Sequence, residues 1–129
     1  MRLTVQPCNA HPTEIKLHQV SRLLEISFDD GSVFKLPYEY LRVYTPSAEA
    51  VGHGPGQEVL QLGKEDITIE ELKPMGRYGV APVFSDGHSS GIYNWDLLYK
   101  LGAEYPALWQ NYLHSLEVAG HKRKEPLPN

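Results

Sequence analysis

Several short segments of the chain alternate apolar and polar residues with a period of two, which is the pattern of half-buried β-strands. The first two cover residues 15–20 and 23–28, and a third covers 33–36 after an Asp30-Gly31 pair. Asp-Gly is a favoured sequence for a type I′ turn, in which both central residues take positive φ. We therefore predict a strand followed by a β-hairpin near the N-terminus.

A similar arrangement returns further along the chain. Strands are predicted over residues 67–72 and 78–84, and Pro82 is expected at an edge or a bulge because proline donates no hydrogen bond to a ladder. A second Asp-Gly turn at 86–87 leads to a short strand over 91–93. Either an ancient duplication or two uses of one convenient turn explains the repeat of Phe-x-Asp-Gly, strand and helix start. The sequence alone favours the second explanation.

Capping residues and apolar spacing predict three helices. Pro37 opens a short helix over 38–42, since the missing N–H of proline costs nothing at the first helical position. Asn94 is expected to cap a helix over 95–101 that ends at Gly102. The last helix, at about 106–120, is predicted to present one apolar face. That face holds Leu108, Trp109, Tyr112, Leu113 and Leu116.

These elements predict an α+β fold with a small, largely antiparallel β-sheet, short helices and a C-terminal helix. One domain is expected over residues 1–121, with its core at about 12–103. Residues 1–13 are predicted to form a loose arm, 44–58 a long loop and 122–129 a disordered tail, because proline, glycine or polar residues concentrate there.

Composition narrows the function classes. The chain has 129 residues and a formal net charge of −4, which argues against general nucleic-acid binding. Its single cysteine, Cys8, cannot form an internal disulfide or a zinc site of several cysteines, and we expect it to be incidental. The sequence contains no secretory h-region and no apolar stretch near the ~20 residues of a membrane span. We expect a soluble cytoplasmic protein without a membrane partner.

The most unusual local sequence is rich in glycine. It consists of Gly52, His53, Gly54, Pro55, Gly56 and Gln57. It lacks the Lys and Ser/Thr of a phosphate-binding P-loop. One interpretation is a tight turn whose glycines take positive φ. The other is a loop that faces a partner or ligand, with His53 as a contact or metal ligand, because long loops in compact domains are often functional.

Asp86 and His88 are the second candidate. A carboxylate and an imidazole this close can orient one another, and histidine is the commonest metal ligand. The alternative is that Asp86 belongs to the hairpin turn and that His88 is a hydrogen-bonded turn residue. The sequence contains no nucleophile elbow, metal-binding H-E-x-x-H or facial-triad spacing, so we assign no catalytic residue. We expect most of the aromatic side chains in the core.

Several motifs in a fixed order carry a resemblance to a known family. They are Leu36-Pro37, Leu41-Arg42, Pro46-Ser47-Ala48-Glu49 and the glycine-rich sequence, then Tyr78, Phe84, Asp86-Gly87-His88, Gly91-Ile92-Tyr93, Trp95, Leu98-Tyr99 and Leu101-Gly102. Over about residues 12–103 the chain resembles stand-alone bacterial proteins related to the N-terminal domain of gamma-butyrobetaine hydroxylase. The resemblance implies an α+β fold. The iron and 2-oxoglutarate site of the full-length hydroxylases belongs to a second domain, so their activity is not carried over.

The resemblance also bears on metal binding. In the hydroxylases this domain holds a structural zinc, and its cysteine positions fall here at Thr45, Ser47 and Ala50, with the histidine position at His88. Hydroxyls and a methyl group cannot replace thiolates at a tetrahedral zinc, so that site is expected to be degenerate and no cofactor is expected. A weaker zinc or iron site built from His53 and His88 with Asp86 or Glu49 remains an alternative.

Related domains also occur fused to P-loop ATPases that carry iron–sulfur clusters. This domain fusion implies a non-catalytic interaction or accessory module that serves iron–sulfur or metal-cofactor handling. It also suggests such an ATPase as the protein partner. The metal-binding alternative stands second. An enzyme acting on a small metabolite is the weakest hypothesis, because no catalytic constellation is present in the sequence.

Overall fold

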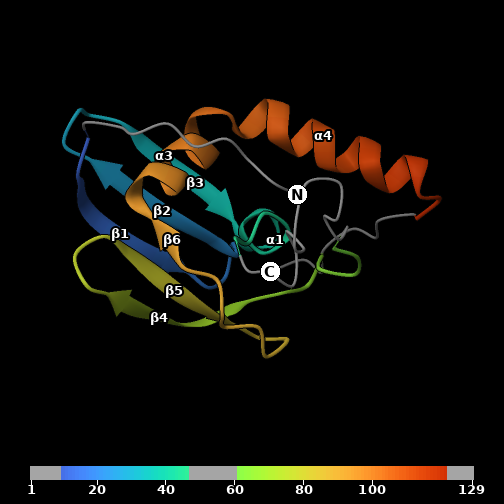
Figure 1. The fold of residues 1–129 in the computed structure, drawn as a ribbon, viewed down its shortest axis with the longest axis horizontal. Coiled ribbons are helices and arrows are strands. Elements are labelled where there is room, and N and C mark those ends of the chain that lie inside the picture. The colour runs from blue at the N-terminus through green and yellow to red at the C-terminus, as the bar shows by residue number, and fades with distance from the viewer. Residues whose placement is uncertain (1–9, 47–60, 122–129) are drawn as a thin grey trace.

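The computed structural model describes residues 10–46 and 61–121, which form two antiparallel sheets of three strands and three helices (Figure 1). The first sheet contains β1 (Pro12–His18), β2 (Leu23–Phe28) and β3 (Val33–Pro37), in that order. The helix α1 (Tyr38–Val43) follows β3 directly. This confirms the predicted strand and hairpin of the N-terminal half.

The second sheet repeats the order of the first. It contains β4 (Ile69–Met75), β5 (Gly79–Phe84) and the two-residue strand β6 (Tyr93–Asn94). The helix α3 (Trp95–Ala103) follows β6, and α4 (Tyr105–Val118) completes the fold. The helix α3 contacts β3 of the first sheet and β6 of the second, α1 contacts β3, and Figure 1 shows α4 extending away from the sheets. The predicted α+β class is confirmed, with the antiparallel strands divided between two sheets.

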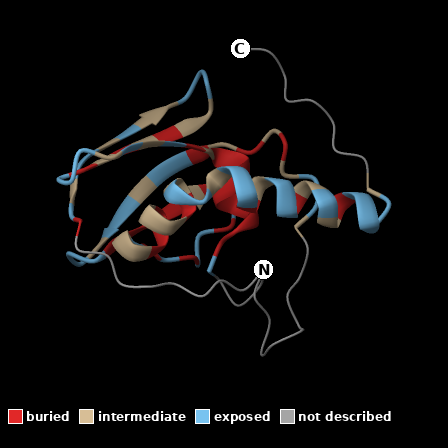
Figure 2. Ribbon diagram, turned by 90° about the horizontal axis from the view of Figure 1, so that it is seen from above, coloured by how far each residue is buried: buried red, intermediate tan, exposed pale blue. Residues whose placement is uncertain are grey.

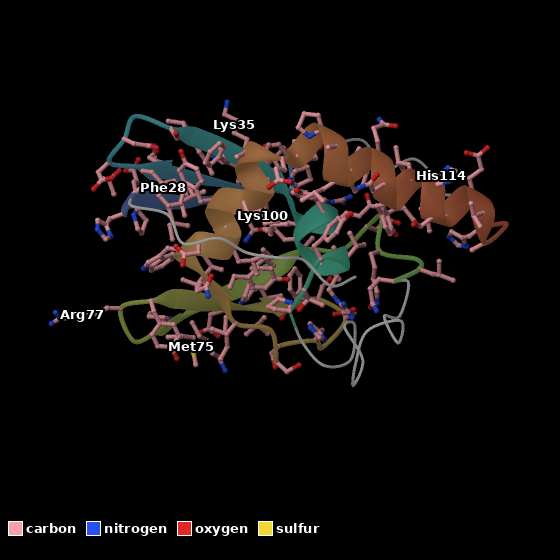
Figure 3. The ribbon with its side chains drawn as sticks, turned by 45° about the horizontal axis from the view of Figure 1, so that its top comes forward. Phe28, Lys35, Met75, Arg77, Lys100 and His114 are labelled. Carbon is pink, nitrogen blue, oxygen red and sulfur yellow. The ribbon has the colours of Figure 1, made fainter. Side chains whose placement is uncertain are left out.

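The core lies where the sheets face the helices (Figure 2). Alternate residues of β2 are buried, as the period-two pattern predicts. The aromatic side chains contribute most of the largest buried groups, and Tyr38, Tyr40, Tyr93 and Tyr112 are each at most 1% exposed. Burying such rings removes a large apolar area from water, so these tyrosines contribute strongly to stability. The apolar face of α4 packs onto this core through Leu108, Tyr112 and Leu116, while His114 points outward (Figure 3).

Both Asp-Gly pairs form tight turns, but not of the predicted type I′. Gly31 donates to the Phe28 carbonyl and Phe28 donates to the Ser32 carbonyl, at 3.1 and 2.8 Å. Gly31 has a φ of 89°, whereas among the described residues other than glycine only Arg22 has a positive φ. The loop therefore has three residues, with glycine alone in the left-handed region, which is the next commonest hairpin connection after the two-residue turns.

The second turn has the same construction. Gly87 donates to the Phe84 carbonyl and Phe84 donates to the His88 carbonyl, at 3.0 and 2.9 Å, and Gly87 has a φ of 88°. In each turn the aspartate also accepts from a backbone amide two residues ahead: Asp30 Oδ1 from Ser32 N at 2.9 Å and Asp86 Oδ1 from His88 N at 3.1 Å. The two turns thus share backbone and side-chain bonding, which the sequence alone indicated only through the shared letters.

Several element boundaries differ from the prediction. β1 begins at Pro12, inside the segment expected to be a loose arm, because the Asp29 amide donates to the His11 carbonyl at 2.8 Å and ties this end to the hairpin. Pro37 is the last residue of β3 and the N-cap of α1, with a ψ of 144°, rather than the first helical residue. β4 covers 69–75 instead of 67–72, and β6 covers 93–94 instead of 91–93.

Two predictions concern special residues of the second half. Asn94 caps α3 as predicted, and its Oδ1 accepts from Leu97 N at 2.8 Å. Gly102, in contrast, lies inside α3 and is not its C-cap, which is Glu104. A Cβ at Gly102 would lie 2.2 Å from Cγ of Phe34, so the glycine is required by the aromatic ring packed against the helix. The glycine-rich sequence, Cys8 and the predicted tail lie outside the described residues.

Candidate functional site

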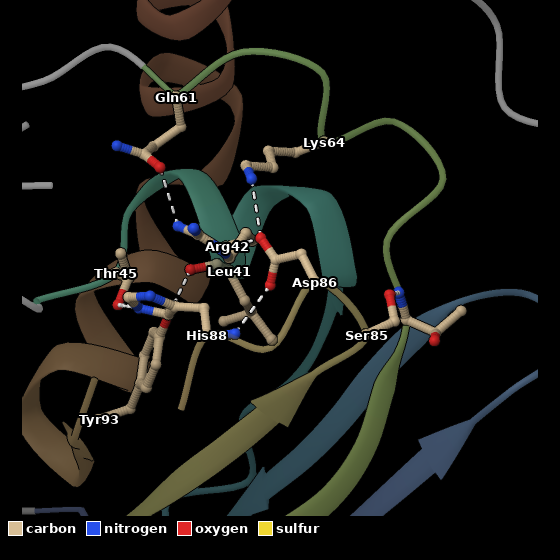
Figure 4. A network of polar contacts seen from close by, with 10 residues as sticks. Leu41, Arg42, Thr45, Gln61, Lys64, Ser85, Asp86, His88 and Tyr93 are labelled. Atoms are coloured by element: carbon tan, nitrogen blue, oxygen red, sulfur yellow. Dashed lines mark hydrogen bonds and ion pairs between the residues drawn. The ribbon is translucent and has the colours of Figure 1, made fainter. Parts of the chain in front are cut away.

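A group of charged side chains gathers at the second Asp-Gly turn (Figure 4). Asp86 Oδ2 accepts hydrogen bonds from Arg42 Nε at 3.0 Å and from Lys64 Nζ at 2.7 Å. Burial raises the pKa of the Asp86 carboxyl. The hydrogen bonds from Lys64 and the His88 amide, together with the charge of Arg42, outweigh that effect and bring the pKa to about 2. Asp86 is therefore a carboxylate at neutral pH.

Arg42 holds its charge in a nearly closed environment. It lies on α1, is only 5% exposed, and its Nη1 donates to Gln61 Oε1 at 3.0 Å. The guanidinium carbon lies 6.0 Å from the centre of the Phe84 ring. A buried cation is stable only if it is paired and hydrogen-bonded, so Asp86 and Gln61 fix its position.

Thr45 and His88 form the second part of the site. Thr45 Oγ1 lies 3.1 Å from His88 Nε2, and both residues are buried. A Cβ at Gly91 would lie 2.3 Å from Thr45 Oγ1, so only glycine leaves room for this hydroxyl. Below this pair, the Tyr93 hydroxyl donates to the Leu41 carbonyl, and burial raises the pKa of Tyr93.

An open depression of about 480 Å³ lies over these side chains. Its wall is made by Arg42, Lys64, Asp86, Gly87, His88, Ser89 and Ser90. The chain reaches the same place from both sides of residues 47–60, because Thr45 contacts His88 and Gln61 contacts Arg42. Both flanks of the glycine-rich sequence are thus anchored at the Asp86 turn.

The structure brings together some of the predicted site residues. Asp86 and His88 share the turn, and Thr45 and His88, two of the four positions that the resemblance aligned with a zinc site, touch each other. His53 and the rest of the glycine-rich sequence, as well as Ser47 and Ala50, lie outside the described residues. Within residues 10–46 and 61–121, no group of three or more His, Cys, Asp or Glu side chains has a geometry that could hold a metal ion.

Sequence reasoning missed Arg42, Gln61 and Lys64 as members of this site. The sequence around Arg42 did indicate a buried cation, because Leu41, Val43 and Tyr44 beside it are large apolar or aromatic residues, and all of them are buried. A cation in such surroundings requires a carboxylate partner. The identity of that partner, 44 residues away, could not be found from spacing.

Comparison with known proteins identifies the family of this domain. Over residues 10–46 and 61–121, two antiparallel three-stranded sheets and three helices define a small α+β domain. The family model described as "Gamma-butyrobetaine hydroxylase-like, N-terminal" matches residues 15–99, and the chain belongs to this family. The match confirms the resemblance seen in the sequence.

Solved structures extend the likeness beyond the family model. One protein with an NMR solution structure is 43% identical, covers 99% of this chain and 96% of its own, and has a TM-score of 0.80. A second NMR structure is 39% identical, with 93% and 94% covered and a TM-score of 0.77. A crystal structure from Acidithiobacillus ferrooxidans ATCC 23270, of a protein of unknown function in the DUF971 family, is 37% identical, with 73% and 94% covered and a TM-score of 0.62.

Two further comparisons limit what can be carried over. No curated protein matches the chain. No helix in the described part of the chain has the length and apolar character needed to cross a membrane.

Proposed function

We propose that this chain is a non-catalytic accessory module of the cytoplasm that binds a protein partner through the Asp86 turn and the adjoining sequence from Gly52 to Gln57. The observation that carries the proposal is the anchoring of Thr45 and Gln61, which flank that sequence, at the charged turn. Recognition segments are usually positioned by a rigid scaffold, and here the described residues on both sides of the sequence bond to the scaffold around the Asp86 turn.

The chemistry of the turn supports binding rather than catalysis. The carboxylate of Asp86 already accepts from two cations and a backbone amide, so it is a poor general base. His88 Nε2 is hydrogen-bonded to a threonine hydroxyl inside the protein. A small-metabolite enzyme is therefore the least supported of the three hypotheses.

The proposed partner is a P-loop ATPase that carries iron–sulfur clusters, with a role in cluster or metal-cofactor handling. This proposal rests on the domain company of the family. It is tested by titrating the purified chain with the purified carrier ATPase of the same genome, in both the cluster-loaded and the empty form. The double variant His53→Ala/Gln57→Ala is expected to weaken binding about tenfold or more, because a few contacts usually carry most of the affinity.

The matched control is Lys35→Ala, an exposed side chain of β3 in the other half of the molecule (Figure 3). It should bind like the unmodified chain, and all three proteins should melt at the same temperature. If the double variant and the control bind the ATPase with equal affinity, the glycine-rich sequence is not part of the interface. No measurable binding to either form of the ATPase would refute the partner.

A second candidate function is metal binding through His53 and His88, with zinc or iron as the ion. The contact between Thr45 and His88 supports it, because the resemblance aligns both positions with ligands of one zinc site. The pairing of Asp86 with Arg42 and Lys64 weighs against a third ligand there, since two cations repel a metal ion. Elemental analysis of untagged protein decides: one metal per chain, lost in His88→Ala, supports the candidate, and none contradicts it.

A further inference from the structure

The Asp86 turn carries more positive charge than its structural role requires. In the first half of the molecule, Asp30 occupies the equivalent place in the first turn, and its Oδ2 accepts from a neutral donor, the Tyr99 hydroxyl, at 2.6 Å. At Asp86 the same carboxylate oxygen receives both a guanidinium and an ammonium group. Arg42 alone would balance the carboxylate, so the charge of Lys64 is in surplus.

The donors of these two cations are only partly used. Arg42 has five N–H groups, and within the described residues its hydrogen bonds engage Nε and Nη1. Arg42 itself lines the depression, together with Lys64. Lys64 Nζ has three N–H groups and donates one of them to Asp86.

The remaining wall of the depression is polar. Ser89 and Ser90 are exposed and line the depression together with the two cations. Two positive groups and one carboxylate give this wall a net charge of +1, on a chain whose formal net charge is −4. An acidic molecule with one local excess of positive charge in a hollow attracts anions to that place.

We propose that this depression is a binding site for the phosphate group of a small phosphorylated molecule or of free phosphate. A tetrahedral phosphate has enough acceptor oxygens to take the flat edge of a guanidinium, an ammonium and hydroxyl groups at once, whereas a carboxylate has two oxygens. The volume of about 480 Å³ leaves room for a small organic group beside the phosphate. The site goes beyond the proposed protein interaction and does not depend on it.

The test is an NMR titration of ¹⁵N-labelled protein, in which inorganic phosphate, glycerol 3-phosphate or sodium chloride is added at constant ionic strength. We expect saturable shifts of the amides from Gly87 to Ser90 with phosphate or its ester, and none with chloride. Tighter binding of the ester identifies a phosphorylated metabolite as the ligand, and tighter binding of phosphate identifies the free ion. Either result supports the site.

Two variants that remove the same charge make the test specific. Lys64→Gln should weaken phosphate binding about tenfold, because it removes one charge-assisted hydrogen bond. Lys35→Gln, on the exposed surface of β3, should leave the affinity unchanged (Figure 3). Lys64→Arg keeps the charge and should retain binding, which separates loss of the ligand contact from a disturbed fold.

Three results would overturn the proposal. They are shifts that grow linearly without saturation, shifts centred away from residues 87–90, and equal affinities of Lys64→Gln and Lys35→Gln. Because the titration contains no protein partner, its outcome is independent of the ATPase experiment.

Discussion

The two β-β-β-α halves of the molecule, 12–43 and 69–103, use one backbone plan with different side-chain chemistry. Each contains a strand, a hairpin closed by Phe-x-Asp-Gly, and a helix that starts directly after the third strand. In the first half the aspartate meets a tyrosine, and in the second it meets an arginine and a lysine. The comparison separates the neutral hydrogen bonding that suffices for the first turn from the two cations that the second turn has in addition.

The helix of each half also contacts the turn of the other half. Arg42 of α1, in the first half, donates to Asp86 of the second turn, while Tyr99 of α3, in the second half, donates to Asp30 of the first turn. The phenylalanine of each turn is also covered from the opposite half. Tyr99 packs edge-on against Phe28, and the Arg42 guanidinium lies over Phe84. Each helix therefore closes the hairpin of the opposite half.

The resemblance between the halves extends to their edges. The Asp29 amide donates to the His11 carbonyl and the Ser85 amide to the Thr68 carbonyl, both at 2.8 Å, and both sheets have a register shift at the start of the first strand. Two independent uses of one turn would not require these matching details outside the turn. The structure thus favours duplication over the explanation that the sequence alone favoured.

The largest effect that we predict comes from introducing cysteines at the positions that the resemblance aligns with a zinc site, next to His88 of the second half. The triple variant Thr45→Cys/Ser47→Cys/Ala50→Cys, with His88 retained, should bind zinc, because three thiolates and an imidazole are a tetrahedral zinc ligand set. At free zinc a thousand times the Kd, it should gain about 4 kcal/mol of stability. Thermal unfolding with and without zinc measures the gain, and adding His88→Ala should remove most of it. A triple variant that ignores zinc would show that these positions are misaligned.

The next effect comes from removing the acid of each turn. Asp86→Ala leaves Arg42 buried without its partner, and we expect a loss of about 3 kcal/mol in the free energy of unfolding. Asp30→Ala should cost far less, since its partner is a neutral and partly exposed hydroxyl. Urea unfolding of both variants makes the comparison. Equal losses would mean that the ion pair adds nothing to what the turn itself contributes.

A third effect tests the crossed packing. Gly102→Ala should destabilise the protein by about 2 kcal/mol, although alanine favours helix over glycine, because the new methyl group meets the Phe34 ring. Phe34→Leu in the same chain should recover part of the loss. Stabilisation by Gly102→Ala alone would contradict the close contact.

A smaller effect is expected in the pH dependence of stability, which reports on the Asp86 carboxylate. The pKa of Asp86 is lowered from 3.8 to about 2, so its contribution to stability is complete above pH 4 and is lost as the pH falls towards 2. The unmodified chain should therefore lose more stability between pH 4 and pH 2 than Asp86→Asn does. Thermal melts across this range provide the measurement, and parallel curves would exclude the carboxylate as the cause.

The smallest effect is expected at the neutral turn. Tyr99→Phe removes the hydroxyl that donates to the exposed Asp30 but keeps the ring against Phe28. The melting temperature should change less than for any variant above. A loss as large as that of Asp86→Ala would show that the two turns are equally dependent on their donors.

The sequence predicted the elements better than the contacts between them. Period-two alternation found the strands, and Asn94 was recognised as a cap, because both depend on neighbours in the chain. Gly102 was assigned to a helix end because its true reason, the ring of Phe34, lies 68 positions away and in the other half. The charged site was half seen for the same reason: Asp86 and His88 adjoin a turn, whereas Arg42 and Lys64 reach it from distant segments.

The crossed contacts have a consequence for how the chain folds. The hydrogen bonds that close the two turns join residues 44 and 69 positions apart, and native contacts of such long range slow folding and make it cooperative. On the ribosome the first hairpin is made several seconds before Tyr99 exists to cover it, at synthesis rates of about 5–20 residues per second. The Phe28 ring, which packs against Tyr99 in the finished domain, lacks that contact during the interval, so the first hairpin carries an apolar ring that waits for its cover.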